Sequence, residues 1–149
     1  MRIPFSDQYV QAVGTAVYAF AYYEWTIIYT IERLEPGFVG EYPRGKPLTS
    51  GGVAKRFREA LDGWTGNGSA SRTELENCYR RFKGLIPKRN ALIHAHPITD
   101  IGGAQILNYQ ASVKKVISDM KWDEGSVMAF AEEVDAASVE AGRIFEKLK

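Results

Sequence analysis

Cysteine and histidine are almost absent from this chain of 149 residues. Its one cysteine, Cys78, leaves no possible disulfide within the chain, no cysteine-based zinc site and no redox pair. The two histidines, His94 and His96, stand one residue apart without a cysteine or third ligand nearby, which is a weak pattern for a metal site. We therefore expect no metal, no cofactor and a reducing, cytoplasmic environment.

An excess of charge of either sign is also missing, because 19 Lys and Arg stand against 18 Asp and Glu, a net charge of +1. The whole chain therefore has no general attraction to nucleic acid, and only a local patch could supply it. Such a patch lies between Tyr79 and Pro97, where Asp and Glu are absent. Its candidate phosphate-contacting residues are Arg80, Arg81, Lys83, Lys88 and, beside them, His96. The alternative is a solvated helix face that happens to be basic.

No apolar run is both long and free of charge. The nearest is Val13 to Ile31, which has Glu24 near its centre and is rich in Tyr, Thr and Ala. A carboxylate in the middle of a bilayer costs about 3 kcal/mol. We expect a central buried helix there rather than a membrane span, and Met1 to Ser6 has no basic region typical of a secretory signal.

The first half of the chain predicts two helices. Ser6 is a candidate N-cap for a long helix from Asp7 to about Glu35, which the following Pro-Gly pair ends. Residues 38–52 are rich in Gly, Pro and Ser and predict a loop or arm. A shorter helix with an apolar stripe follows from Val53 to Trp64, and a Gly-rich turn ends it.

A third helix begins at a capping box formed by Ser71 and Glu74. Its apolar stripe continues in phase to Arg89, although Pro87 should kink or restart the helix. Burying an unpaired charge is costly, so Arg89 should meet an anionic partner, a wet cleft or a subunit interface. Glu24 is the natural candidate for that partner.

The second half completes a helical fold. Pro97 should end the third helix, and residues 98–109 with Gly102-Gly103 predict a short hairpin or extended insert. Asp123 can cap a last helix that runs to about Leu148. We predict one all-α domain over residues 1–149, a four- to five-helix bundle with a short β-hairpin or extended insert before the last helix.

The segment from Arg89 to His94 carries the only recognisable chemistry. An arginine presents a planar set of donors that fits phosphate oxygens, and a histidine exchanges a proton near neutral pH. Residues 89 and 94 lie roughly 140° apart on an ideal helix, whereas residues 89 and 96 are nearly in line. Because His96 precedes a proline and is pushed out of helical geometry, His94 ranks first as the base and His96 stays an alternative.

The run Arg89-Asn90-Ala91-Leu92-Ile93-His94 resembles the signature of the HEPN superfamily (higher eukaryotes and prokaryotes nucleotide-binding), in which an arginine and a polar residue precede a histidine. The resemblance implies an all-α domain with metal-independent endoribonuclease activity, as in toxins of toxin–antitoxin and abortive-infection systems. It implies that His94 moves a proton, that Arg89 holds the scissile phosphate and that Asn90 orients one of them.

The resemblance also implies the reaction and its partners. RNA is the substrate because the ribose 2′-hydroxyl attacks the phosphodiester, which gives a 2′,3′-cyclic phosphate and a 5′-hydroxyl. A homodimer that brings two motifs to one cleft and a cognate antitoxin protein are the expected partners. The alternative is a non-catalytic HEPN-like helical scaffold for dimerisation or partner-protein binding.

Overall fold

The computed structural model describes residues 6–42, 47–114 and 117–148. The chain divides into two compact units, one of Met1–Phe20 with Pro87–Val134 (unit 1) and one of Ala21–Ile86 with Asp135–Lys149 (unit 2). The described residues form helices α1 (Asp7–Leu34), α2 (Phe38–Glu41), α3 (Ser50–Asp62), α4 (Arg72–Ile93) and α5 (Glu124–Glu146), and strands β1 (His96–Thr99), β2 (Gln105–Tyr109) and β3 (Met120–Trp122).

Three helices begin where the sequence predicts. The hydroxyl of Ser6 accepts a hydrogen bond from the amide three residues further on, at 3.1 Å, and Asp123 does the same at 2.7 Å. Ser71 and Glu74 form the complete capping box, because each side chain accepts from the other residue's amide, at 3.1 and 2.9 Å. Each cap satisfies backbone donors that lack a partner inside the helix.

The predicted loop over residues 38–52 is partly helical. It contains α2 and the first turn of α3, whose cap is Thr49, with its side chain accepting from the Gly52 amide at 3.0 Å. The prediction that this helix begins at Val53 was therefore wrong, because a good cap offsets the low helix propensity of two glycines in the first turn. Residues 43–46 of the predicted arm lie outside the described residues.

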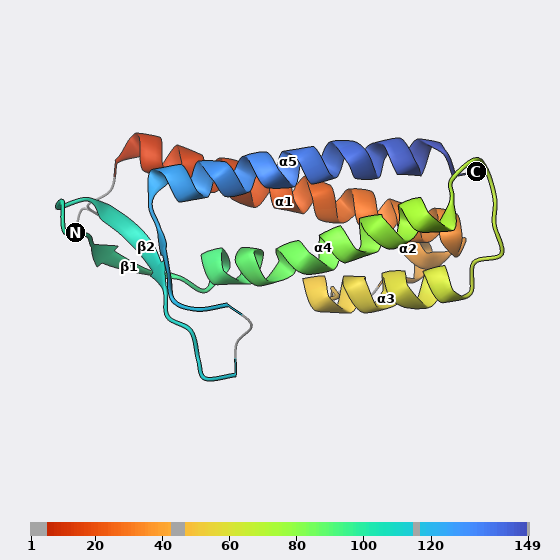
Figure 1. The fold of residues 1–149 in the computed structure, drawn as a ribbon, viewed down its shortest axis with the longest axis horizontal. Coiled ribbons are helices and arrows are strands. Elements are labelled where there is room, and N and C mark those ends of the chain that lie inside the picture. The colour runs from red at the N-terminus through yellow and green to blue at the C-terminus, as the bar shows by residue number, and fades with distance from the viewer. Residues whose placement is uncertain (1–5, 43–46, 115–116, 149) are drawn as a thin grey trace. The chain divides into compact units, whose positions relative to one another are not determined.

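Unit 2 is built on packed aromatic rings. Tyr23 of α1 meets Phe82 of α4 edge-on with ring centroids 5.5 Å apart, and Phe57 of α3 meets Tyr79 in the same manner at 5.8 Å. The part of α4 that belongs to this unit runs beside α3 (Figure 1). The fully buried apolar residues of unit 2 include Ile27, Ile28, Ile31, Val53, Leu61 and Leu75.

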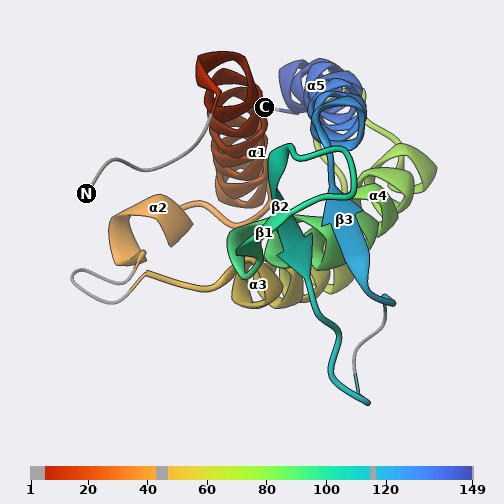
Figure 2. The same ribbon diagram turned by 90° about the vertical axis from the view of Figure 1, so that its left-hand side faces the viewer.

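Unit 1 contains an antiparallel sheet in the order β1-β2-β3, with β2 in the middle (Figure 2). The predicted hairpin corresponds to β1 and β2, which pair His96 with Asn108. The strand β3 was not predicted, and it pairs Trp122 with Leu107. The fold is therefore mostly helical with a small sheet, not strictly all-α.

The end of α4 also differs from the prediction. The helix passes through Pro87 without a restart and ends at Ile93, before Pro97. A proline inside a helix removes one backbone hydrogen bond, and the rest of the helix can persist around it. Pro97 lies in β1, an edge strand, where a missing amide donor is tolerated.

Tyr9 joins the start of α1 to the sheet inside unit 1. Its buried hydroxyl donates to the carbonyl of Trp122 at 2.5 Å and accepts from the amide of Leu107 at 2.8 Å. Burial raises the pKa of Tyr9 above its usual value, so the phenol stays protonated. Trp122 in turn packs on Phe130 of α5, with ring centroids 5.5 Å apart. One phenol thus satisfies two backbone groups of neighbouring strands.

Within residues 6–42, 47–114 and 117–148, none of the helices combines the length and the apolar character needed to cross a bilayer. This includes α1, which covers the apolar run weighed above.

Candidate functional site

A cavity of about 460 Å³ lies in unit 1 beside the last turns of α4. We call it the motif cavity, because two of its lining residues, Asn90 and His94, belong to the Arg89–His94 motif. Its described lining residues are Pro87, Asn90, His94, Tyr109, Gln110, Ser112 and Ile117.

Asn90 and His94 reach this cavity together because Asn90 lies in the last turn of α4 and His94 is the residue directly after the helix, four positions further on. Residues four positions apart lie on the same helix face. The backbone amide of His94 donates to the carbonyl of Asn90 at 2.9 Å, so the helical hydrogen-bond pattern extends to the backbone of His94. The His94 side chain is exposed, and it has no hydrogen-bond partner among the described residues. Its ring nitrogens are therefore accessible to a ligand.

Arg89 lies next to the motif cavity and does not line it. Its Nη1 donates to Oδ1 of Asn90 at 3.1 Å, and its guanidinium lies 5.8 Å from the ring centroid of Phe20. This cation–π contact explains how an arginine can occupy the inward stripe while half-buried. No carboxylate in the described part of unit 1 lies within ion-pair distance of Arg89. Arg89 therefore connects to the cavity through Asn90.

His96 is outside the motif cavity. It is exposed in β1 and pairs with Asn108. Because α4 ends at Ile93, the helical alignment of residues 89 and 96 does not apply. The expected exclusion of His96 from helical geometry before Pro97 is confirmed.

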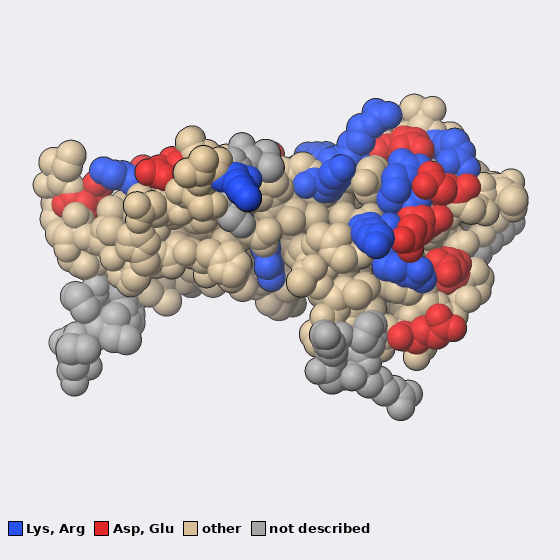
Figure 3. Space-filling view, turned by 90° about the horizontal axis from the view of Figure 1, so that it is seen from below, with Lys and Arg blue, Asp and Glu red and all other residues tan. Residues whose placement is uncertain are grey.

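The basic patch meets acidic side chains of α5. Two of its members are paired, Arg81 with Glu140 at 3.1 Å and Lys88 with Glu133 at 3.0 Å. Figure 3, which draws the face seen from below Figure 1, shows that lysines and arginines lie among aspartates and glutamates on that face as well. Exposed pairs of this kind are weak and exchange with other anions. The patch is thus less positive than its sequence alone indicates.

The other two candidates in the patch, Arg80 and Lys83, have no ion-pair partner within the residues that the structure describes. Arg80 donates to the side chain of Asn77 at 3.4 Å, and the Lys83 ammonium lies 5.9 Å from the ring centroid of Tyr79. Both are exposed, so their charges remain available to an anion.

Glu24 accepts a hydrogen bond from the hydroxyl of Ser50 at the start of α3, in unit 2. Ser50 is buried and Glu24 is half-buried. The pair with Arg89 that we expected would join residues of different units, and it stays a prediction.

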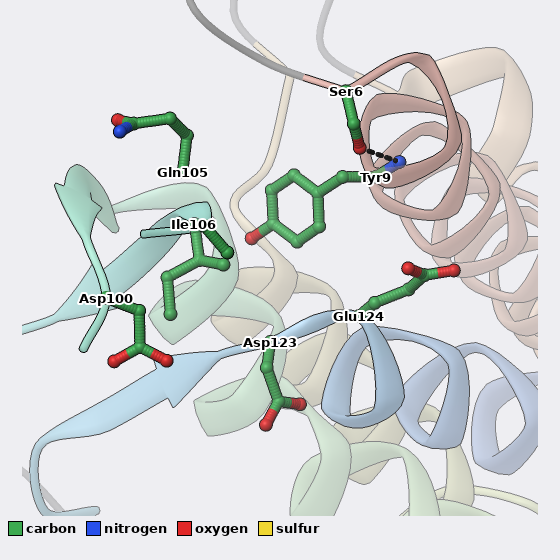
Figure 4. A pocket seen from close by; sticks show the side chains of 8 residues that line it. Ser6, Tyr9, Asp100, Gln105, Ile106, Asp123 and Glu124 are labelled. Atoms are coloured by element: carbon green, nitrogen blue, oxygen red, sulfur yellow. Dashed lines mark hydrogen bonds between the residues drawn. The ribbon is translucent and has the colours of Figure 1, made fainter. Parts of the chain in front are cut away.

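A second cavity in unit 1, of about 450 Å³, contains three carboxylates around the ring of Tyr9 (Figure 4). We call it the acidic cavity. Asp100 accepts from Lys121 at 2.9 Å, and Glu124 accepts from Gln8 at 2.6 Å. Asp123 is the α5 cap. Lys121 lowers the pKa of Asp100, and the Ser126 amide lowers the pKa of Asp123.

In the described part of the chain no group of three His, Cys, Asp or Glu is arranged to hold a metal.

The motif cavity includes residues that the sequence did not single out, namely Tyr109, Gln110, Ser112 and Ile117. The predicted hairpin ended at Tyr109, and no motif marks the segment after it. Only the pairing of β2 with its neighbours brings that segment opposite α4.

Comparison with protein-family models, with curated proteins and with solved structures gives no match. The likeness to the HEPN superfamily therefore depends on the motif residues alone.

Proposed function

We propose that the chain is a metal-independent endoribonuclease of the HEPN type, which acts in the cytoplasm as a toxin or defence protein. The observation that carries this proposal is that His94 and Asn90 line one cavity while Arg89 is hydrogen-bonded to Asn90 at 3.1 Å. A proton-exchanging imidazole and a phosphate-binding guanidinium are then joined through one amide. These are the two groups that phosphodiester cleavage by a 2′-hydroxyl needs.

In the proposed reaction the neutral imidazole of His94 takes the proton of the ribose 2′-hydroxyl. The 2′-oxygen attacks the adjacent phosphorus, and the bond from phosphorus to the 5′-oxygen breaks. The imidazolium of His94 then gives that proton to the leaving 5′-oxygen, so the products are a 2′,3′-cyclic phosphate and a 5′-hydroxyl and the neutral imidazole is restored. Arg89 uses Nη1 for Asn90, and its remaining donors stabilise the negative charge on the phosphate oxygens.

Arg80 and Lys83 would add electrostatic attraction for the RNA backbone, because they have no described ion pair. We expect smaller contributions from Arg81 and Lys88, whose ion pairs must open first. A homodimer would bring a second copy of the motif to the phosphate, since Arg89 lies outside the cavity wall of its own chain. An antitoxin that covers this surface is the corresponding protein partner.

The decisive experiment compares His94→Ala with His96→Ala. Each variant loses one imidazole from the same short segment, but only His94 lines the motif cavity. Purified proteins are incubated with labelled RNA in the presence of EDTA, and the product ends are mapped. We expect His94→Ala to lower the cleavage rate by roughly 100-fold or more, and His96→Ala to change it only a few-fold. Equal rates in the wild type and His94→Ala would contradict the proposal.

A second candidate function, the non-catalytic scaffold, is favoured by one surface of α1 in unit 2. Tyr22, Trp25 and Tyr29 are 63%, 44% and 48% exposed at spacings of three and four residues, and the rings of Trp25 and Tyr29 lie 5.8 Å apart. Exposed apolar groups that cluster in this way are typical of interaction surfaces. On this hypothesis Tyr22→Asp reduces oligomer mass in analytical ultracentrifugation, and Arg89→Ala or His94→Ala removes no nuclease activity.

A further inference from the structure

The residues that the structure describes in the walls of the motif cavity are polar but nearly uncharged. Its described lining contains two amide groups, from Asn90 and Gln110, and the hydroxyls of Ser112 and Tyr109. Lys, Arg, Asp and Glu are absent from the described lining, and His94 is the one imidazole there. A buried phosphate needs cationic or backbone donors around it. The interior of this cavity therefore suits a neutral group better than an anion.

The size of the cavity supports the same conclusion. At about 460 Å³ it falls within the range of roughly 300–1,000 Å³ that is usual for small-molecule sites, and it exceeds what a phosphate group needs. Pro87 and Ile117 add apolar surface to the polar groups. Apolar surface with a few hydrogen-bonding groups is the environment that an unstacked nucleobase occupies in single-strand recognition.

Apart from Asn90, which accepts from Arg89, the polar side chains of the cavity have no partner among the described residues. The side chains of Gln110, Ser112 and His94 form no hydrogen bond with any residue that the structure describes. By contrast, Gln105, at the other end of β2, donates its amide to Thr99 at 2.7 Å. A free amide offers both a donor and an acceptor, the pair of functions displayed by the edge of a base.

We propose that the motif cavity binds the unstacked nucleobase next to the scissile phosphate, with Gln110 and Ser112 as the residues that read its edge. The phosphate then lies at the mouth of the cavity, near His94 and the Asn90-bound Arg89. Cleavage is consequently selective for the identity of one nucleotide. This proposal rests on the proposed ribonuclease function and names the feature of the substrate that the site selects.

The first test measures cleavage of RNAs that differ only in the nucleotide beside the cleaved bond. Gln110→Ala should reduce the ratio between the fastest and slowest substrate by about tenfold, because it removes hydrogen bonds to the base edge. Ser112→Ala should also reduce this ratio, and it provides the test if Gln110→Ala folds poorly. Gln105→Ala is the matched control, and we expect it to keep the wild-type ratio. An unchanged ratio in both Gln110→Ala and Ser112→Ala would overturn the assignment.

The second test does not depend on cleavage. The wild-type protein is titrated with the four nucleoside 5′-monophosphates, and with ribose 5-phosphate as the probe that lacks a base, while the Gln110 side-chain amide is followed by NMR. We expect at least one nucleotide, and not ribose 5-phosphate, to shift this signal. Such a shift without any RNA cleavage would support the base site and contradict the ribonuclease. Equal shifts with ribose 5-phosphate, or no shift with any nucleotide, would overturn the base site even if RNA is cleaved.

Discussion

The two cavities of unit 1 are similar in volume, about 460 and 450 Å³. They differ in whether the polar side chains that line them already have hydrogen-bond partners. The acidic cavity includes Gln105 from the start of β2, and the motif cavity includes Tyr109 from its end. In the acidic cavity every carboxylate is held by a hydrogen bond. In the motif cavity the amide of Gln110 and the imidazole of His94 have no partner among the described residues.

This difference distinguishes polar groups that already make hydrogen bonds within the protein from polar groups that can still bind a ligand. A cavity lined by three carboxylates is the more conspicuous feature, yet each of those groups already satisfies an amide or an ammonium. Hydrogen bonds that are already made favour one conformation and leave little for a ligand. The motif cavity is the better candidate because its polar groups still have unused donors and acceptors.

Among the variants that compare the two cavities, Arg89→Ala should produce the largest effect. We expect the cleavage rate to fall roughly 100-fold, because the guanidinium stabilises charge that develops in the transition state. Lys88→Ala is the matched control, since it removes one positive charge from the same helix at a residue paired with Glu133. It should change the rate less than about threefold, as expected for an exposed ion pair. Equal losses in the two variants, measured as kcat/KM on one RNA, would attribute the effect to net charge.

Tyr9→Phe tests the structural character of the acidic cavity. The substitution leaves the carbonyl of Trp122 and the amide of Leu107 without their partner. Leaving buried backbone groups unpaired should lower the free energy of unfolding by about 1–3 kcal/mol, measured by urea denaturation. Cleavage at temperatures well below the transition should stay at the wild-type level. A loss of cleavage in folded protein would instead make this cavity part of the functional site.

Asp123→Ala should have an intermediate effect that depends on pH. Replacing an N-cap costs about 1 kcal/mol, and the cap on the Ser126 amide lowers the pKa of Asp123 in the folded state. A lowered folded-state pKa contributes stability above the ordinary Asp pKa, and this contribution is lost as the pH falls through the lowered value. The stability difference between wild type and variant should therefore be full at pH 7 and shrink below pH 4. A difference that is constant from pH 7 to pH 2.5 would contradict this explanation.

The helix starts could be predicted because caps are local. Ser6, Ser71 and Asp123 bond to amides within the first turn of their own helices, so their sequence context contains the whole interaction. The short strand β3 could not be predicted, because three residues give no periodicity and the strand depends on pairing with Leu107 through Tyr109. For the same reason the predicted end of α4 was too late, because His96 and Pro97 belong to β1 and pair with β2.

The candidate site divides along the same line. Arg89, Asn90 and His94 are visible in sequence because they lie within six consecutive residues at the end of α4. Their different surroundings were not visible in the sequence. The guanidinium of Arg89 lies over the ring of Phe20, a residue of another helix, whereas His94 lines the cavity. Gln110 had no signal at all, since its approach to α4 depends on the course of the chain after β2. The spacing of residues in the sequence is enough to identify a motif. Which of its residues line the same cavity depends on tertiary contacts that the sequence does not show.

Asp100→Asn should have the smallest effect and tests the comparison most finely. The carboxylate is partly exposed and pairs with Lys121 at 2.9 Å, an interaction that water and salt screen strongly. We expect the melting temperature to change by less than about 3 °C and the cleavage rate to remain unchanged. Lys121→Ala is the control from the other side of the pair and should give the same small shift, with the two substitutions non-additive. A marked loss of cleavage in Asp100→Asn alone would show that this carboxylate does more than hold Lys121.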